Sequence, residues 1–195
     1  MRNVCITGAS GYIGNKIARF LSQKDEIENI VGIDINPRKE FIPKFHFYKR
    51  DVRDDIEDIL ANNSIDTMIH TAYVLPPIHN KQLMEDINVG GTRNVIRACF
   101  RTKVEQILYT SSSTAYGFHP DNDNPLTEDS QLRGNADFTY CKNKREIEMA
   151  IPEWMKDSNG MNLIILRPCF VVGPGFDNPL SRYLRKKIVI LPFHT

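Results

Sequence analysis

Short apolar runs alternate with longer segments of helical spacing along this chain of 195 residues. Strands are predicted where aliphatic and aromatic residues cluster between turn residues, over 4–7, 30–33, 45–48, 67–70, 106–110 and 163–166. Helices are predicted where apolar residues recur every three or four positions, over 12–23, 54–60, about 80–100 and 140–151. The stretch 118–135, rich in Asp, Asn, Pro and Gly, is predicted to be a loop. This alternation favours right-handed crossovers and a doubly wound parallel α/β sheet.

Composition and charge narrow the classes of function. Hydrophobic residues make up 41% of the chain and charged residues 25%, as in an ordinary soluble globular protein. With 25 basic and 24 acidic residues, the chain offers no electrostatic basis for binding nucleic acid or an anionic membrane. The sequence has no C-x-x-C pair, no metal-ligand spacing of histidines and no apolar run long enough to span a membrane. We therefore expect reduced thiols, a cytoplasmic location and no metal site.

A glycine-rich turn lies between the first predicted strand and the first predicted helix. Gly8, Gly11 and Gly14 follow the spacing G-x-x-G-x-x-G within the segment TGASGYIG at 7–14. In such a turn the first glycine permits the tight bend, the second lets the backbone approach a phosphate, and the third lets the helix pack closely on the strand. The helix start adds free N–H groups and the positive end of the helix dipole. The segment therefore predicts a pyrophosphate site.

Two acidic residues follow later strands, where the adenosine half of a dinucleotide would lie. Asp34 ends the second strand, about twenty residues past the glycine turn, and can accept hydrogen bonds from the ribose hydroxyls. Its charge would repel a 2′-phosphate and so favours NAD over NADP, a preference that Arg38 could soften. Asp51, followed by Val52, comes just after the third strand and could bind the adenine amine.

Candidate catalytic residues lie on the last predicted helix and on the strand before it. Tyr140 and Lys144 are four apart and share a helix face, so the ammonium can lie near the phenol and favour the phenolate, lowering the tyrosine's pKa. Three serines at 111–113 follow the fifth strand, and hydroxyls at that end of a strand face the ligand crevice of such sheets. One of them could hold a substrate oxygen for proton exchange with Tyr140.

The chain resembles the NAD-dependent epimerase/dehydratase group of the extended short-chain dehydrogenases/reductases. The resemblance rests on ordered motifs over nearly the whole chain: TGASGYIG, Asp34, Asp51-Val52, His70-Thr71-Ala72, NVGGT at 88–92, SSSTAYG at 111–117, Tyr140-x-x-x-Lys144 and Leu166-Arg167-Pro168. It implies a Rossmann-type NAD-binding fold over 1–175 that carries the catalytic residues. It also implies that 176–195 begin a substrate-binding lobe that is here cut short.

By this resemblance Tyr140 is the acid/base, Lys144 orients it and binds the nicotinamide ribose, and Ser112 is the partner hydroxyl. Asn88 would be a supporting polar residue of the catalytic set. The residues expected to line bound NAD are Gly8, Ser10, Gly11, Tyr12, Ile13, Gly14, Asp34, Ile35, Asp51, Val52, His70, Thr71, Ala72, Tyr73, Ser111, Tyr140, Lys144, Pro168 and Val171.

The sequence departs from the family pattern in ways that bear on the substrate. Phe170 stands where members that act on nucleotide sugars usually have an asparagine, which puts a UDP- or dTDP-sugar in doubt. The serine stretch lacks the Thr-Asp-Glu set typical of the sugar dehydratases, so Ser113 and Thr114 argue against that branch. The expected reaction is hydride transfer between NAD and a hydroxyl-bearing carbon of a small molecule, either a sugar or nucleotide sugar, or a non-sugar substrate of a dehydrogenase or reductase. Four possibilities stay open: epimerisation, a regulatory NAD-binding role, NAD binding without turnover, and a homodimer.

Overall fold

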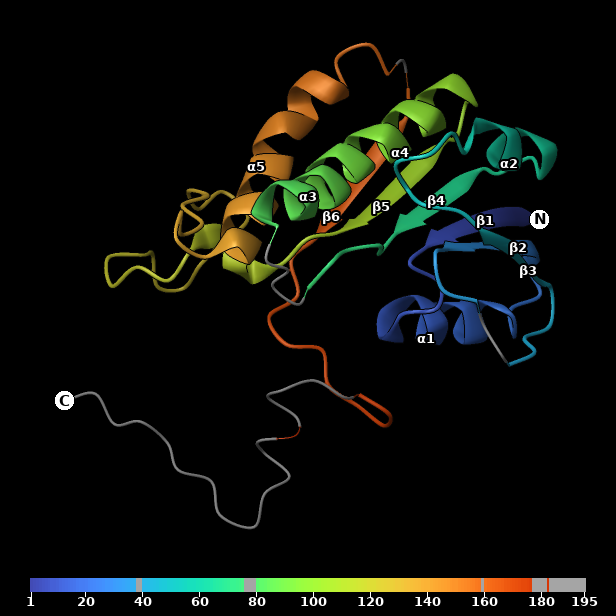
Figure 1. The fold of residues 1–195 in the computed structure, drawn as a ribbon, viewed down its shortest axis with the longest axis horizontal. Coiled ribbons are helices and arrows are strands. Elements are labelled where there is room, and N and C mark those ends of the chain that lie inside the picture. The colour runs from blue at the N-terminus through green and yellow to red at the C-terminus, as the bar shows by residue number, and fades with distance from the viewer. Residues whose placement is uncertain (38–39, 76–79, 159, 177–181, 183–195) are drawn as a thin grey trace.

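Six parallel strands form one sheet in the order β3-β2-β1-β4-β5-β6 (Figure 1). The structure is a computed structural model that describes residues 1–37, 40–75, 80–158, 160–176 and 182. The strands are β1 (Arg2–Thr7), β2 (Ile27–Asp34), β3 (Phe45–Lys49), β4 (Thr67–His70), β5 (Gln106–Thr110) and β6 (Asn162–Leu166). All five neighbouring pairs are parallel, which confirms the predicted doubly wound α/β fold. The strand order reverses between β1 and β4, and in such sheets this switch point is where ligands bind.

Helices cover both faces of the sheet (Figure 1). The helical elements are α1 (Tyr12–Leu21), α2 (Glu57–Asn62), α3 (Lys81–Glu85), the π-helical turn η1 (Asp86–Gly90), α4 (Gly91–Arg101), the short 3₁₀ helix η2 (Ser113–Tyr116) and α5 (Thr139–Trp154). Helix α1 packs on one face, and α2, α4 and α5 pack on the other.

Two apolar cores follow from the alternation of side chains along the strands. Along β1, Cys5 points to the core shared with α2, α4 and α5, whereas Val4 and Ile6 point to the core shared with α1. On β6, Leu163 and Ile165 join the first core, but Ile164 and Leu166 are largely exposed. The outer part of the α1-side face is therefore uncovered within the described residues.

The predicted strands all form, and the helices differ from prediction in their details. The helix predicted over 80–100 is continuous, but it passes through the π-helical turn η1 between α3 and α4. Helix α2 begins at Glu57 rather than at 54, because the Asp55 carboxylate accepts the Glu57 N–H at 2.9 Å and the chain before it turns. Leu83 is exposed on α3.

Candidate functional site

The glycine turn joins β1 to α1 with little space to spare. Gly8 has a φ of +70°, the left-handed region that favours glycine, and its N–H donates to the Ile33 carbonyl at 2.9 Å. A Cβ on Gly8 would lie 2.7 Å from the Ala72 nitrogen, and one on Gly14 would overlap the Gly8 carbonyl. The first and third glycines thus have the steric roles that their spacing predicted.

The start of α1 is open to an anion. Its N-cap is Gly11, which has no side chain to occupy the first-turn N–H groups, and the first turn contains no acidic residue. Tyr12 and Ile13 follow, both half-buried, and the Tyr12 ring meets the Phe176 ring edge-on at 5.0 Å. The N–H groups and dipole at this end fit the pyrophosphate of a dinucleotide.

Asp34 lies at the end of β2 and braces the same turn. Its Oδ2 accepts the Ser10 N–H at 3.0 Å, and its Oδ1 accepts the Asn36 N–H at 2.9 Å. The Ser10 hydroxyl donates to the Asn36 carbonyl at 2.7 Å. Ile35, the next residue, is exposed. The carboxylate therefore sits beside the phosphate turn, as predicted for a ribose-binding acid; Arg38 lies outside the described residues.

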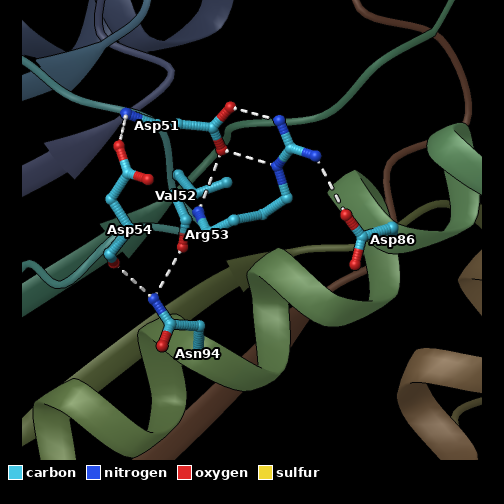
Figure 2. A network of polar contacts seen from close by, with 6 residues as sticks. All are labelled: Asp51, Val52, Arg53, Asp54, Asp86 and Asn94. Atoms are coloured by element: carbon cyan, nitrogen blue, oxygen red, sulfur yellow. Dashed lines mark hydrogen bonds and ion pairs between the residues drawn. The ribbon is translucent and has the colours of Figure 1, made fainter.

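Asp51 and its neighbours form a polar network after β3 (Figure 2). Arg53 donates to Oδ1 at 3.0 Å and to Oδ2 at 2.8 Å, and it also contacts Asp86 at 2.9 Å. These Arg53 contacts lower the pKa of Asp51. The Val52 carbonyl accepts from the Asn94 amide at 2.8 Å, so the loop is fastened to α4. No pattern in the sequence indicated Arg53 as part of this site.

His70 links three elements beneath the switch point. Its two ring nitrogens lie 2.6 Å from the Thr7 hydroxyl and 3.0 Å from the Thr92 hydroxyl. Burial lowers the pKa of His70 to about 3, so the ring is neutral near pH 7. The Thr71 hydroxyl donates to the Thr7 carbonyl at 2.7 Å. These contacts hold the ends of β1 and β4 together, where the glycine turn and Ala72 meet.

Lys144 is buried at the centre of the candidate catalytic group, with 2% of its surface exposed. Its Nζ donates to the Thr110 carbonyl at 2.7 Å and to the Tyr109 hydroxyl at 3.3 Å. The ammonium also lies over the Tyr73 ring, 3.9 Å from its centroid, as in a cation–π contact. Burial lowers the pKa of Lys144 to about 7.

Tyr140 shares a face of α5 with Lys144, but its acidity differs from the prediction. Burial raises the pKa of Tyr140, while a hydrogen bond with the Ser112 side chain acts in the opposite direction. Lys144 does not lower the pKa of Tyr140 as expected, because the Lys144 Nζ donates to the Thr110 carbonyl and lies against the Tyr73 ring. Its distance from the Tyr140 ring centroid is 6.0 Å.

Ser112 and Asn88 take different positions around this group. The Ser112 hydroxyl accepts from the Thr114 N–H at 3.2 Å and caps η2. Asn88 lies in the π-helical turn, and its amide accepts from the Val74 N–H at 2.8 Å and donates to the Val74 carbonyl at 3.2 Å. Both ends of this amide therefore hold the loop after β4, which carries Tyr73, rather than contact Tyr140 or Lys144.

The remaining predicted cofactor-lining residues lie at the same edge of the sheet. The Ser111 N–H donates to the Leu166 carbonyl at 2.8 Å, and the Ser113 N–H donates to the Pro168 carbonyl at 3.1 Å, so pairing of β5 and β6 continues past their ends. Val171 is half-buried and follows in the mostly exposed loop after Pro168.

Sequence reasoning missed Glu148, a buried carboxylate one helical turn beyond Lys144. The four-residue repeat Tyr140, Lys144, Glu148 was visible in the sequence and could have indicated it.

Two negative findings concern the described part of the chain. No group of three or more His, Cys, Asp or Glu residues there could hold a metal ion. No helix in those ranges is long and apolar enough to cross a membrane.

The fold and site define a nucleotide-binding α/β domain of the dehydrogenase type. Residues 4–190 match the family model described as "NAD dependent epimerase/dehydratase family". The chain belongs to this family, whose cofactor is NAD.

Solved structures share the fold. The Bordetella bronchiseptica enzyme WbmH, in complex with NAD⁺, is 25% identical with a TM-score of 0.78, and the match covers 95% of this chain and 61% of that one. MoeE5, in complex with UDP-glucuronic acid and NAD, is 26% identical with a TM-score of 0.79, over 94% and 60% of the two chains.

Among curated relatives, cinnamoyl-CoA reductase 2 of Arabidopsis thaliana is 26% identical over 195 residues, which is 93% of this chain and 58% of the relative. Relatives from Mycobacterium bovis and Mycobacterium tuberculosis are 27% identical over 194 residues, which is 95% of this chain and 52% of their length. The chain thus spans about half the length of the curated relatives that it matches.

Proposed function

We propose that this chain binds NAD along the carboxyl edge of the sheet and moves a hydride between NAD and a hydroxyl-bearing carbon. The observation that carries the proposal is the buried Lys144, fixed at the end of β5 beneath Tyr73 and on the same helix face as Tyr140. A buried ammonium beside a tyrosine at a switch point suits proton transfer to or from a substrate oxygen.

The binding residues divide along the dinucleotide. The first-turn N–H groups of α1 would hold the pyrophosphate, Asp34 the adenosine ribose, and Asp51-Val52 the adenine. The backbone around Ala72, Ser111 and Pro168, with Val171, would line the nicotinamide half, since these segments meet at the same edge.

The protein's own residues supply the proton chemistry. NAD when bound supplies the hydride acceptor or donor. Tyr140 takes the proton of the substrate hydroxyl, or returns it in the reverse direction, and Ser112 hydrogen-bonds the same oxygen. Lys144 binds the nicotinamide ribose through its Nζ. Asn88 acts through the loop after β4, which it holds by the Val74 backbone.

A sugar or nucleotide sugar is the first candidate substrate, supported by the UDP-glucuronic acid bound to MoeE5. A non-sugar carbonyl compound is the second, favoured by apolar groups around Tyr140. The ring of Phe138, which is 50% exposed, lies 6.0 Å from that of Tyr140. The sequence similarity to cinnamoyl-CoA reductase 2 supports the same alternative.

Three further points remain proposals: a C-terminal substrate lobe that begins after residue 175, a homodimer and a cytoplasmic location. Residues 177–181 and 183–195 lie outside the described part.

Two measurements test this function. Calorimetric titration with NAD tests binding. Turnover is tested by NADH absorbance with cinnamaldehyde and NADH, and by product analysis with UDP-glucose and NAD, because epimerisation leaves no net change in NADH. Tyr140→Phe should abolish turnover and leave NAD affinity nearly unchanged, because only the transferable proton is lost. Tyr48→Phe is the matched control, since the Tyr48 hydroxyl contacts Asn63 away from the site. Normal turnover in Tyr140→Phe would remove Tyr140 as the acid/base, and no NAD binding by the wild type would overturn the proposal.

A further inference from the structure

Glu148 is a carboxylate buried inside the domain, with 1% of its side chain exposed. It lies on α5 one turn beyond Lys144, which itself lies one turn beyond Tyr140. Residues four apart on a helix lie on the same face, so the three side chains form one row. A buried, ionised carboxylate is costly unless other groups compensate its charge, so its contacts have to be accounted for.

The two oxygens of Glu148 are held from two strand ends. The Ser111 hydroxyl donates to Oε1. Arg167 donates to Oε2 through Nε at 2.9 Å and through Nη2 at 2.7 Å. The third guanidinium nitrogen, Nη1, donates to the Tyr116 hydroxyl at 2.6 Å and to the Glu128 carbonyl at 3.1 Å. The carboxylate is therefore paired and hydrogen-bonded as a buried charge requires.

These contacts join segments that carry the proposed cofactor and substrate groups. Ser111 precedes Ser112 at the end of β5, and Arg167 precedes Pro168 at the end of β6. Tyr116 in turn donates to the Thr127 carbonyl at 2.8 Å, so the loop over 118–135 is attached to the same network. A shift of Glu148 would move both strand ends relative to α5.

Groups from each neighbouring element face Lys144. Tyr73 and Tyr109 present neutral rings from the loop after β4 and from β5. His70 on β4 is neutral near pH 7, because its pKa is about 3. On α5 itself, Tyr140 lies on one side and Glu148 on the other. Burial lowers the pKa of Lys144, and the charge of Glu148 opposes that lowering, whereas Arg167 is paired to Glu148.

We propose that Glu148 is a positioning residue of the redox site: its buried carboxylate favours the ammonium form of Lys144 and, through Ser111 and Arg167, fixes the ends of β5 and β6. The effect on Lys144 is a property of this chain alone. The consequence for turnover rests on the proposed function, because only there does the Lys144 ammonium bind the nicotinamide ribose.

The direct test is an NMR titration of the Lys144 side chain in protein labelled with ¹³C and ¹⁵N lysine, with Lys144→Arg used to assign its signal. Glu148→Gln keeps the size and hydrogen-bonding capacity of the side chain but removes its charge. We expect Lys144 to lose its proton at a pH lower by about 1 unit or more, the scale for removing a nearby opposite charge. Glu146→Gln is the control, since Glu146 contacts Lys142 on the flank of α5. An unchanged Lys144 titration in Glu148→Gln overturns the proposal.

Glu148→Gln leaves Arg167 without its carboxylate, so a second variant guards against loss of folding. Glu148→Gln/Arg167→Met removes both charges, and its Lys144 should titrate between the wild type and the single variant. A Lys144 titration at the wild-type pH in the double variant also overturns the proposal.

The activity readout separates this inference from the proposed function. If the wild type turns over substrate, the alkaline limb of its pH–rate profile should move to lower pH in Glu148→Gln and stay in place in Glu146→Gln. If the NMR shift occurs but no NAD-dependent turnover is found, the proposed function fails while the coupling of Glu148 to Lys144 stands.

Discussion

Replacing Gly8 with alanine tests whether the close approach of two strand ends shapes the phosphate turn. The added Cβ would lie 2.7 Å from the Ala72 nitrogen, 2.8 Å from its Cα and 2.9 Å from the Thr71 carbonyl carbon. All three are backbone atoms of the segment after β4, so no flexible side chain can move aside. The φ of +70° adds strain, because an L-residue is disfavoured there.

The two contributions can be separated with Gly160→Ala. Gly160 has a similar φ, +84°, but a Cβ there would meet nothing within 4 Å. This control should cost only the backbone strain, about 1–2 kcal/mol. Gly8→Ala should add a steric cost of about 1–3 kcal/mol, the usual scale for overpacking, for a total of about 2–5 kcal/mol.

The assay is urea denaturation followed by circular dichroism, with the free energies of unfolding of the two variants compared with the wild type. Gly8→Ala should also weaken NAD binding in calorimetry, since the turn that offers its N–H groups is displaced, whereas Gly160→Ala should bind NAD normally. Equal losses of stability in the two variants would refute the steric argument and leave only backbone strain at Gly8.

Two further predictions concern single side chains. Asp34→Ala should weaken NAD binding by about 1–3 kcal/mol, the cost of losing a hydrogen bond to a charged group, and equal affinity for NAD before and after would exclude the ribose role. Tighter binding of NADP than of NAD by the wild type would contradict the predicted cofactor preference. The folded-state pKa of His70, about 3, is below its unfolded value near 6.5. Its neutral form therefore stabilises the fold fully above pH 6.5, and this contribution falls by about 1.4 kcal/mol per pH unit as the pH drops toward 3. In urea denaturation, the stability difference between wild type and His70→Asn should shrink from pH 7.5 to pH 5, with exposed His46→Asn as the control. A constant difference would mean that His70 does not remain neutral.

Local patterns in the sequence were sufficient to predict the order of elements and the position of the turn. Helical and strand periodicities depend on neighbours a few positions away, so all six strands were predicted. The glycine spacing is likewise local, because φ and steric demand at Gly8 and Gly14 arise where strand passes into helix. Element boundaries were less certain, as with the delayed start of α2, which a side chain–backbone hydrogen bond of Asp55 decides.

The acidity of the site groups could not be predicted in the same way. The sequence suggested that Lys144 would lower the pKa of Tyr140, since the two are four apart on a helix. The structure instead directs the Lys144 Nζ to the Thr110 carbonyl and over the Tyr73 ring. Those partners come from β5 and from the loop after β4, so the direction of the ammonium depends on packing rather than on spacing.

The sequence by itself therefore determined the doubly wound sheet, the glycine turn and the placement of Tyr140 and Lys144 on one face of α5, because each depends on a short-range pattern. Only the tertiary structure decided which of those groups are buried and what compensates their charge. The pairing of Glu148 with Arg167, 19 residues away, is the clearest case. Neither residue belongs to a periodic pattern that links the two, and they meet because β6 pairs with β5 beneath α5. Burial then strengthens the electrostatic effect of Glu148, since a carboxylate removed from water acts strongly on the groups beside it.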